Sequence, residues 1–329
     1  MRSVIIGTGS YLPRKVVTND DLAQVLDTSD EWITTRTGIR ERRIADRTGD
    51  ESCVGMGIKA AKAALTMARL DASDLDLIIT ATVTPDFRLP SASCLIQDGL
   101  GAINVPAFDL AAACAGSLYA LSIADSFIRS GTYKNVLVVA SEVMSSVVDW
   151  SDRNTAVLFG DGASAAILSA HAHADAGFID FDLYADGRLK EVISIRDGDS
   201  LSFAQVSGRP QRSKIFMNGR ETYKFAVRAV CDAVEKIITD NQVAIDDIKH
   251  IVPHQANLRI IEAIATRLDV PLDRFLINLD RCANTSAASL LLAYDEKNRH
   301  SGFNKGDLIL LLAIGAGFVW GAGLYRVPV

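Results

Sequence analysis

The chain has 329 residues, of which 49% are hydrophobic and 22% are charged, and its mean hydropathy is +0.18. This length and apolar content predict a substantial core in one large domain or two, and the ordinary charge content excludes a disordered chain. A net charge of −6 argues against general nucleic-acid binding, and an acidic partner would need a local basic patch.

Both halves of the chain alternate apolar, strand-like runs with helix-like runs. We expect strands over residues 4–7, 77–82, 105–110, 136–140, 163–169, 177–183, 250–252 and 308–313, and helices over residues 54–70, 115–129, 221–238, 258–268 and 285–297. Such alternation is typical of an α/β protein with a largely parallel sheet covered by helices.

Three segments need separate interpretation. Residues 6–13 begin like a dinucleotide-binding fingerprint, but the third glycine is missing and Leu12-Pro13 interrupts the required helix. Residues 308–325 are uncharged and long enough for a membrane helix, yet four glycines divide them into two buried strands around a turn. Residues 187–214 are polar and are predicted to be a loop-like insertion. The sequence therefore favours neither nicotinamide binding nor membrane insertion.

The cysteines indicate a reducing compartment. Their number is odd, their spacing matches no metal site, and no signal peptide is recognised, so we expect a cytoplasmic protein without a metal centre. They are Cys53, Cys94, Cys114, Cys231 and Cys282.

Cys114 is the candidate nucleophile. A strand-like stretch leads into it and a helix of small and apolar residues follows, which places the thiol at the start of a buried helix. The free N–H groups and the dipole of that helix are expected to favour the thiolate, and the small neighbours leave room for a substrate. A lone cysteine is more often a structural core residue, so Cys114 by itself does not decide between the two interpretations.

Two later junctions support a catalytic interpretation. His254 lies on the loop between a short strand that ends at Pro253 and a helix that Asn257 is expected to cap. Asn284 precedes another helix. Taken singly, a surface or capping histidine and an N-cap asparagine explain them. Together with Cys114, they place cysteine, histidine and asparagine on three strand-to-helix junctions, which predicts one nucleophilic site at one end of a sheet.

With these residues in place, the chain resembles the β-ketoacyl-acyl carrier protein synthases III, condensing enzymes of the thiolase superfamily, over essentially all of its length. The type III assignment depends mainly on the His254/Asn284 pair and the Trp32/Arg36 segment. The matching segments are 32–33, 36–39, Cys114, 159–163, 254–257, 284–289, 315–317 and 320–321.

The resemblance implies an α/β, thiolase-like, five-layered αβαβα fold built from two duplicated βαβαβ halves. Residues 1–172 would carry the cysteine, and residues 173–329 would carry the histidine and the asparagine. It also implies a homodimer, which no residue pattern here demonstrates.

The implied reaction is a decarboxylative condensation that initiates fatty-acid synthesis. An acyl-CoA acylates Cys114, and malonyl-acyl carrier protein then reacts with the acyl group to give a β-ketoacyl-carrier protein. His254 and Asn284 would donate hydrogen bonds to the malonyl thioester oxygen and stabilise the enolate. The oxyanion hole would use the backbone N–H groups of Cys114 and Ala316. Acyl-CoA is a substrate, so no cofactor is expected.

The resemblance also assigns residues outside the reaction centre. Lys224 and Arg259 match positions that contact the acidic carrier protein, although Arg220, Lys224 and Arg228 also fit an ordinary solvated helix face. The residues expected to bind coenzyme A are Trp32, Arg36, Arg153, Arg220 and Tyr223.

Two positions of the expected acyl pocket depart from the family pattern. Leu89 and Ile314 stand where phenylalanine is common. The hypothesis that follows is a primer larger than acetyl, either branched or of medium chain length.

Other functions remain open. A specialised relative in secondary metabolism, with a non-acetyl primer or another acyl acceptor, would keep the same three residues, although Asn284 favours decarboxylation over simple acyl transfer. A thiolase would need a second cysteine near Gly315, and the sequence has none there. A non-catalytic acyl-CoA or carrier-protein binder is disfavoured because all three side chains are present.

Overall fold

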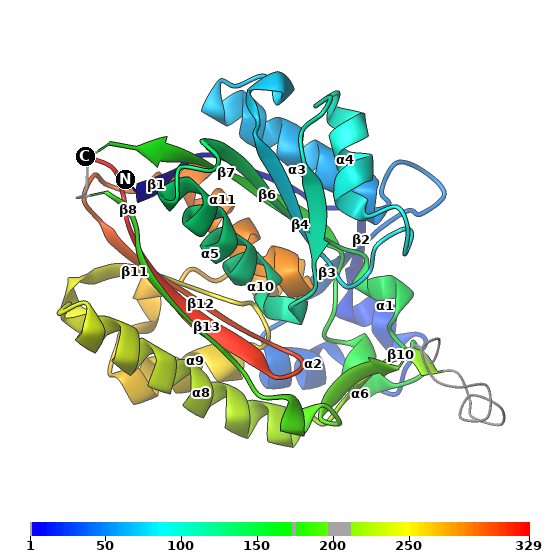
Figure 1. Ribbon diagram of the computed structural model, residues 1–329. Coiled ribbons are helices and arrows are strands. Elements are labelled where there is room, and N and C mark those ends of the chain that lie inside the picture. The colour runs from blue at the N-terminus through cyan, green and yellow to red at the C-terminus, as the bar shows by residue number, and fades with distance from the viewer. Residues whose placement is uncertain (1, 173–175, 197–211) are drawn as a thin grey trace.

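The computed structural model describes residues 2–172, 176–196 and 212–329, which form five stacked layers (Figure 1). Helices α3 (Cys53–Ala68) and α4 (Ala92–Leu100) cover one face of a five-stranded sheet. Helices α5 (Gly116–Arg129) and α11 (Ser289–His300) lie between this sheet and a four-stranded sheet. Helices α8 (Gly219–Asp240) and α9 (Leu258–Leu268) cover the outer face of the second sheet. The predicted αβαβα architecture is confirmed.

Each sheet is largely parallel, as expected, but contains one strand that runs in the opposite direction. In the order β1-β7-β6-β4-β5, only β7 runs opposite to the other strands, and in the order β11-β12-β13-β8 only β13 does, because each is antiparallel to both of its neighbours. A parallel connection needs a crossover of about a dozen residues or more, whereas residues 316–318 alone join β12 to β13. The strands are β1 (Arg2–Tyr11), β4 (Leu77–Ala81), β5 (Ala107–Leu110), β6 (Asn135–Glu142), β7 (Gly162–His171), β8 (Gly177–Ala185), β11 (Ile248–Pro253), β12 (Leu308–Gly315) and β13 (Val319–Arg326).

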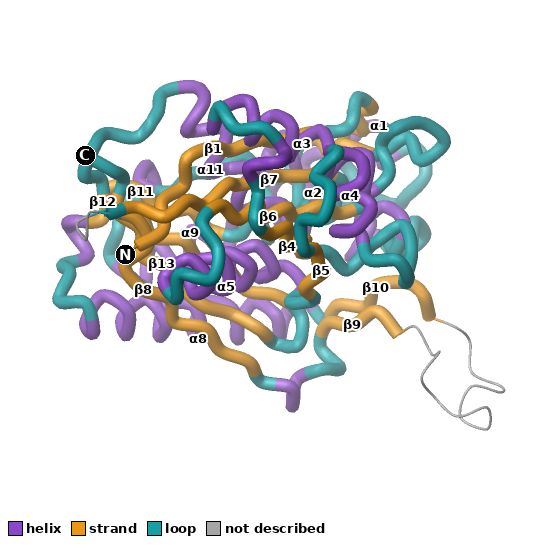
Figure 2. Tube along the Cα trace, turned by 45° about the horizontal axis from the view of Figure 1, so that its top comes forward, coloured by secondary structure: helices purple, strands orange, loops and turns teal. Residues whose placement is uncertain are grey.

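The predicted loop-like insertion over residues 187–214 contains a hairpin. Strands β9 (Ile193–Arg196) and β10 (Arg212–Met217) pair antiparallel and lie side by side in Figure 2. Residues 197–211 of that prediction lie outside the described residues. The remaining short elements are β2 (Lys15–Thr18), α1 (Asn19–Ala23), α2 (Asp30–Thr37), β3 (Glu41–Ile44), α6 (Arg153–Ala156), α10 (Leu279–Cys282) and the 3₁₀ turns η1 (Ala72–Asp74), η2 (Ala113–Ala115), η3 (Met144–Ser146), η4 (Gly187–Leu189), η6 (Ile245–Asp247), η7 (Leu272–Arg274) and η8 (Ser286–Ala288).

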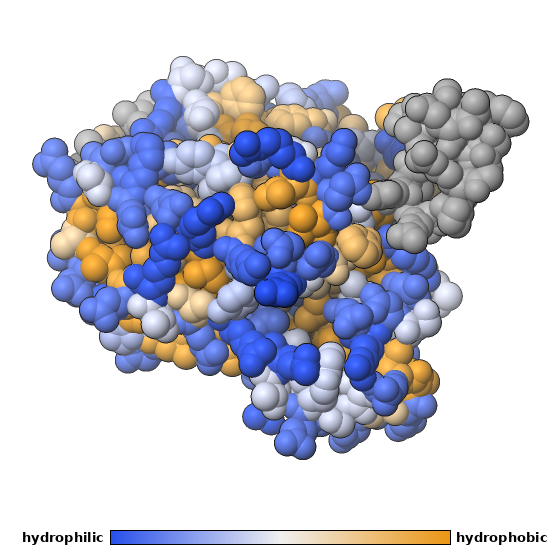
Figure 3. All heavy atoms as spheres, turned by 90° about the horizontal axis from the view of Figure 1, so that it is seen from below, coloured by the Kyte–Doolittle hydropathy of each residue, from blue (hydrophilic) through white to orange (hydrophobic). Residues whose placement is uncertain are grey.

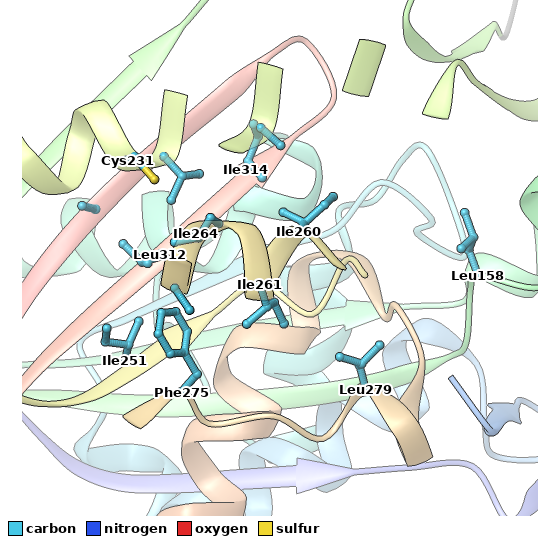
Figure 4. Close-up of a cluster of buried hydrophobic side chains, with 14 of the residues drawn as sticks. Leu158, Cys231, Ile251, Ile260, Ile261, Ile264, Phe275, Leu279, Leu312 and Ile314 are labelled. Carbon is cyan, nitrogen blue, oxygen red and sulfur yellow. The ribbon is translucent and has the colours of Figure 1, made fainter. Parts of the chain in front are cut away.

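The uncharged segment near the C-terminus forms strands β12 and β13 around a glycine-containing turn, as predicted. Along β12, alternate side chains point to opposite faces: Leu310, Leu312 and Ile314 pack toward α8 and α9, while Leu311 and Ala313 pack toward the central helices (Figure 4). In the described part of the chain, no helix has the length and apolar character needed to cross a membrane.

The central layer ties the two parts of the chain together. The strands of the first sheet come from residues 2–171 and those of the second from residues 177–326. Helix α11 nevertheless packs on β1 and β7, and α5 contacts both sheets. The division into residues 1–172 and 173–329 therefore stays a prediction, and the central layer is where residues from both parts meet.

Candidate active site

Cys114 lies between strand β5 and helix α5, as predicted. It sits in the 3₁₀ turn η2, which leads directly into the helix, and the residue as a whole is partly exposed although its thiol group is buried. The preceding residue, Ala113, has a φ of +45°, an unfavourable value for alanine. The chain therefore makes a sharp, strained turn that presents the sulfur at the end of the sheet.

The expectation of a thiolate at rest is wrong for the site as the structure shows it. Burial raises the pKa of the Cys114 thiol to about 12, and the nearby Glu142 raises this pKa further, although a hydrogen bond with Ser286 lowers it. The loss of hydration outweighs the benefit of the helix N-terminus. The thiol is therefore protonated near neutral pH, and its proton must leave when the sulfur attacks.

The glycine turn after β12 lies against the nucleophile. A Cβ atom on Gly315 would come within 2.7 Å of the backbone N of Cys114 and 3.0 Å of that of Ala115, so only glycine permits this approach. Ala316 does not take a positive φ, so alanine is tolerated there, as expected. The turn is thus positioned beside the backbone N–H of Cys114, the other group expected in the oxyanion hole.

His254 is buried just beyond the end of β11. Its backbone N–H donates to the Leu312 carbonyl oxygen at 2.7 Å, and its Nδ1 lies 2.6 Å from Ser289 Oγ. Burial lowers the pKa of His254 to about 3. The imidazole is therefore neutral at physiological pH, in agreement with the expected neutral donor.

Ser289 determines which ring nitrogen of His254 carries the hydrogen. The Ser289 Oγ accepts a hydrogen bond from the backbone N–H of Gln255 at 3.2 Å. When the hydroxyl hydrogen is directed to His254 Nδ1, the neutral ring carries its hydrogen on Nε2, which is the arrangement that the expected donor role requires. This tautomer leaves Nε2–H as the group that can donate to a substrate oxygen.

We expect Ser289→Ala to slow malonyl decarboxylation about tenfold, because one hydrogen bond worth about 1 kcal/mol no longer selects the tautomer. Acylation of Cys114 should remain close to normal. The measurement is carbon dioxide release, together with ¹⁵N NMR of the His254 ring, whose signals should move from the Nε2–H form toward a tautomer mixture. Ser289→Thr, which keeps a hydroxyl group, is the matched control. Unchanged ring signals in the alanine variant would contradict this role.

Asn284 is held by a parallel bridge to Phe159. Its backbone N–H donates to the Leu158 carbonyl oxygen at 2.9 Å, and its own carbonyl oxygen accepts from Gly160 N–H at 3.0 Å. A Cβ on Gly160 would lie 2.7 Å from the Cys282 carbonyl oxygen, so glycine permits this approach. The Asn284 Oδ1 accepts from Ser286 N–H at 2.8 Å, which leaves its Nδ2 hydrogens as donors.

Residues 284–289 connect the three candidate catalytic residues. This segment contains Asn284, its turn η8 packs against the turn η2 that carries Cys114, and its Ser289 hydroxyl bonds His254. Non-glycine residues with a positive φ cluster around the site, which is typical of functional positions. They are Ala113 (+45°), Ala283 (+56°) and Ser286 (+50°).

Sequence analysis missed three polar residues of this site. Ser286 and Ser289 were noted only as part of a matching motif, without a role. Glu142 was not singled out, although it is the charged residue at the end of an otherwise uncharged strand, β6. That contrast was the available signal, because a buried carboxylate needs a structural or functional reason.

Three residues expected to bind coenzyme A lie together. The guanidinium carbons of Arg36 and Arg153 lie 4.5 Å and 4.9 Å from the centroid of the Trp32 ring. Arg153 also donates to the backbone oxygen of Asp27 at 2.6 Å. Trp32 thus sits within a cationic aromatic cluster that suits an adenine ring and phosphate groups.

The other predicted positions lie on exposed surfaces. Arg220, Tyr223 and Lys224 are exposed on the first two turns of α8, and Lys224 pairs with Glu221 at 3.3 Å. Arg259 is exposed in the first turn of α9. Figure 3 shows that hydrophilic side chains dominate this side of the molecule, apart from scattered apolar areas.

Leu89 and Ile314 face different surroundings within one chain. Leu89 is 87% exposed in the loop before α4, whereas Ile314 is buried in the cluster between the second sheet and helices α8 and α9 (Figure 4). Leu89 and Ile314 therefore do not line a common pocket within one chain. Their role in the acyl pocket stays a prediction.

Comparison with known proteins agrees with this geometry. Residues 108–187 match the family model for 3-oxoacyl-acyl-carrier-protein (ACP) synthase III, and residues 238–327 match the model of its C-terminal part. A β-ketoacyl-acyl-carrier-protein synthase III from Xanthomonas campestris is 46% identical over 324 residues, which cover 98% of each chain. One from Caldanaerobacter subterraneus is 45% identical over 323 residues, which cover 98% of this chain and 97% of that protein.

Solved structures are similar over the same length. The 3-oxoacyl-acyl-carrier-protein synthase III from Aquifex aeolicus superposes with a TM-score of 0.92 at 45% identity, covering 98% of this chain and 99% of that one. A priming β-ketosynthase from a polyketide biosynthetic pathway superposes with a TM-score of 0.91 at 36% identity, covering 99% and 96%.

Proposed function

The chain belongs to the β-ketoacyl-acyl carrier protein synthase III family, and from this membership we propose how its own residues carry out the condensation. It is a condensing acyltransferase of fatty-acid biosynthesis. Relatives of this name are 45–47% identical over nearly the whole chain, so the alternative of a specialised enzyme of secondary metabolism is not favoured.

The single observation that carries the residue assignment is the convergence of Cys114, His254 and Asn284 on residues 284–289. In the first half-reaction, the sulfur of Cys114 attacks the thioester carbon of an acyl-CoA, and CoA leaves. The backbone N–H groups of Cys114 and Ala316 would stabilise the oxyanion that forms. The acyl group then remains on the sulfur as a thioester.

In the second half-reaction, malonyl-acyl carrier protein loses carbon dioxide. Nε2–H of His254 and Nδ2–H of Asn284 donate to the thioester oxygen, where the enolate charge develops. A neutral imidazole suits this step, because it donates a hydrogen bond without bringing an extra charge into a buried site. The resulting carbanion attacks the acyl carbon and displaces the Cys114 sulfur.

Incubation with a panel of acyl-CoAs from acetyl to decanoyl tests this proposal. Intact-protein mass spectrometry should show one acyl adduct, which peptide digestion should place on Cys114. Addition of malonyl-acyl carrier protein should then release carbon dioxide and remove the adduct. An adduct on another cysteine, or no adduct with any primer, would overturn the assignment. Preferential loading of branched or medium-length chains would support the hypothesis of a larger primer at Leu89 and Ile314.

We expect Trp32→Ala to raise the KM for acyl-CoA about tenfold and to leave kcat nearly unchanged, because a stacking or cation–π contact is worth about 1–2 kcal/mol and lies far from the reacting atoms. Steady-state kinetics measure this effect. An acyl-pantetheine substrate is the control, since it lacks the nucleotide and its KM should not change. Equal losses with both substrates would show that Trp32 serves the fold instead.

The carrier protein is proposed to dock beside α8 and α9. Exposed Lys224 and Arg259 supply local positive charge on an otherwise acidic chain, with Arg228 exposed farther along α8. Attraction between this surface and an acidic carrier protein would lower the KM for malonyl-acyl carrier protein and weaken with salt. Charge reversal at Lys224 and Arg259 tests this, since the KM for acyl-CoA should stay unchanged.

A homodimer is proposed from the edge of the first sheet. Strand β5 lies at that edge and contains the exposed Phe108, and the exposed Ile103 precedes it in the chain; their exposures are 37% and 79%. An unpaired edge with exposed apolar side chains is suited to pairing with a second copy. Sedimentation equilibrium distinguishes a dimer from a monomer.

The five free thiols fit a proposed cytoplasmic location.

A further inference from the structure

Glu142 is a fully buried carboxylate at the end of β6. Its Oε2 accepts hydrogen bonds from Thr82 Oγ1 at 3.2 Å, Val83 N–H at 3.1 Å and Thr84 Oγ1 at 2.5 Å. These partners are neutral donors. A buried carboxylate held only by such donors can accept a proton without breaking an ion pair.

The Thr84 hydroxyl group has a defined direction. Its Oγ1 accepts from the backbone N–H of Val143 at 2.8 Å, so its single hydrogen is directed to Glu142. The Thr82 Oγ1 likewise accepts from Thr84 N–H at 3.1 Å. Burial, the largest effect, raises the pKa of Glu142, whereas these donors lower it and favour the ionised carboxylate.

The other carboxylate oxygen is connected to the nucleophile. Ser286 Oγ donates to Glu142 Oε1 at 3.0 Å, and the turn η8 that carries Ser286 packs against the turn η2 that carries Cys114. A serine hydroxyl has one hydrogen. When that hydrogen is directed to Glu142, the oxygen is left to accept the S–H hydrogen of Cys114.

We propose that Ser286 and Glu142 form a proton relay that removes the thiol hydrogen of Cys114 as the sulfur attacks acyl-CoA. The inference rests on the proposed function of Cys114. Its physical basis is the cost of burying charge. A thiolate beside an ionised Glu142 would place two negative charges in a buried site, whereas proton transfer to Glu142 leaves one negative charge, which moves to the sulfur. Glu142 does not touch the reacting atoms and acts only through Ser286.

The transfer is balanced at each atom. The Cys114 S–H bond breaks and its proton goes to Ser286 Oγ, while the Ser286 O–H proton goes to Glu142 Oε1. The sulfur electron pair forms the new S–C bond to the acyl carbon, and the C–S bond to CoA breaks with its electrons on the CoA sulfur, which takes a proton from solvent. When condensation displaces Cys114 as a thiolate, the proton returns from Glu142 through Ser286.

The titratable groups around the relay come from three other elements. Cys53 of α3 lies 3.5 Å from Thr82 Oγ1, and burial raises the pKa of this thiol to about 12, so it stays protonated. Asp86, in the loop after β4, accepts from the backbone N–H of Cys53 and bonds Ser52. His254, beyond β11, is neutral. Glu142 accepts the hydrogen bond of Ser286, and its carboxylate can take up the proton that leaves the Cys114 thiol.

The test compares Glu142→Gln with wild type. Single-turnover acylation of Cys114 by acyl-CoA is followed by intact-protein mass spectrometry from pH 6 to 10, and malonyl decarboxylation is followed separately. We expect Glu142→Gln to slow acylation about 100-fold at pH 7, the usual contribution of a general base. The rate should then rise about tenfold per pH unit, because hydroxide must take the proton, whereas decarboxylation should stay close to normal.

Matched variants separate a relay from a structural role. Glu51→Gln neutralises another buried glutamate, which bonds Tyr11 and the backbone of Arg14 and Asp46, and it should leave the acylation profile unchanged. Ser286→Ala should reproduce the slow, hydroxide-dependent acylation, which keeps the inference testable where Glu142→Gln fails to fold. Wild-type pH dependence in either relay variant would overturn the relay. Failure of the wild-type Cys114 to accept any acyl group would instead overturn the proposed function itself.

Discussion

Replacement of Cys114 by alanine should abolish acyl-enzyme formation and reduce condensation by about 10,000-fold or more, because the thiol that forms the acyl-enzyme is removed. Decarboxylation of malonyl-acyl carrier protein should persist, since His254 and Asn284 remain in place. Mass spectrometry measures the missing adduct, and carbon dioxide release measures the remaining half-reaction.

Cys94→Ala is the matched control for this variant. Cys94 is an exposed thiol on α4, so its removal should leave both half-reactions intact. Loss of decarboxylation in Cys114→Ala would show that the substitution disturbs residues 284–289 as well. Persistent acylation in that variant would show that the nucleophile lies elsewhere.

The opposite pattern is expected for His254→Ala and Asn284→Ala. Each should slow decarboxylation about 100- to 1,000-fold, because one hydrogen-bond donor to the developing enolate oxygen is lost. Acylation of Cys114 should continue, so the acyl-enzyme should accumulate. His300→Ala, at an exposed position on α11, is the control and should behave like wild type. Normal condensation in either site variant would contradict the role assigned to that residue.

The pH dependence gives an independent check on His254. Its folded-state pKa of about 3 lies below the ordinary 6.5, so decarboxylation should show no transition from this residue between pH 5 and 8. Between about pH 6.5 and 3, His254 is protonated in the unfolded chain but not in the folded protein. As the pH falls through this range, this difference should lower the free energy of unfolding by about 1.4 kcal/mol per pH unit. This contribution should be absent in His254→Ala, as denaturation at several pH values would show.

Much of the architecture follows from local sequence patterns. The periodicity that predicted helices 54–70, 221–238 and 258–268 is intrinsic to the chain, and the structure forms α3, α8 and α9 there. The predicted helix over residues 285–297 begins instead as the turn η8 before α11. The reversed direction of β7 and β13 could not be predicted in this way, because parallel and antiparallel strands have similar composition when both faces are buried.

The sequence by itself determined the layer order of the fold, the family, and the positions of Cys114, His254 and Asn284 on strand-to-helix junctions. Local residue types and spacing place the three residues, whereas the family and the layer order are implied by the resemblance that the motifs carry. Only the tertiary structure decided the protonation and hydrogen-bond directions of the site. The thiol of Cys114 is protonated because packing removes its water, and Ser286 meets Glu142 across 144 residues of chain. Burial and hydrogen-bond direction depend on contacts between distant segments, and these exist only once the two sheets close on their shared central helices.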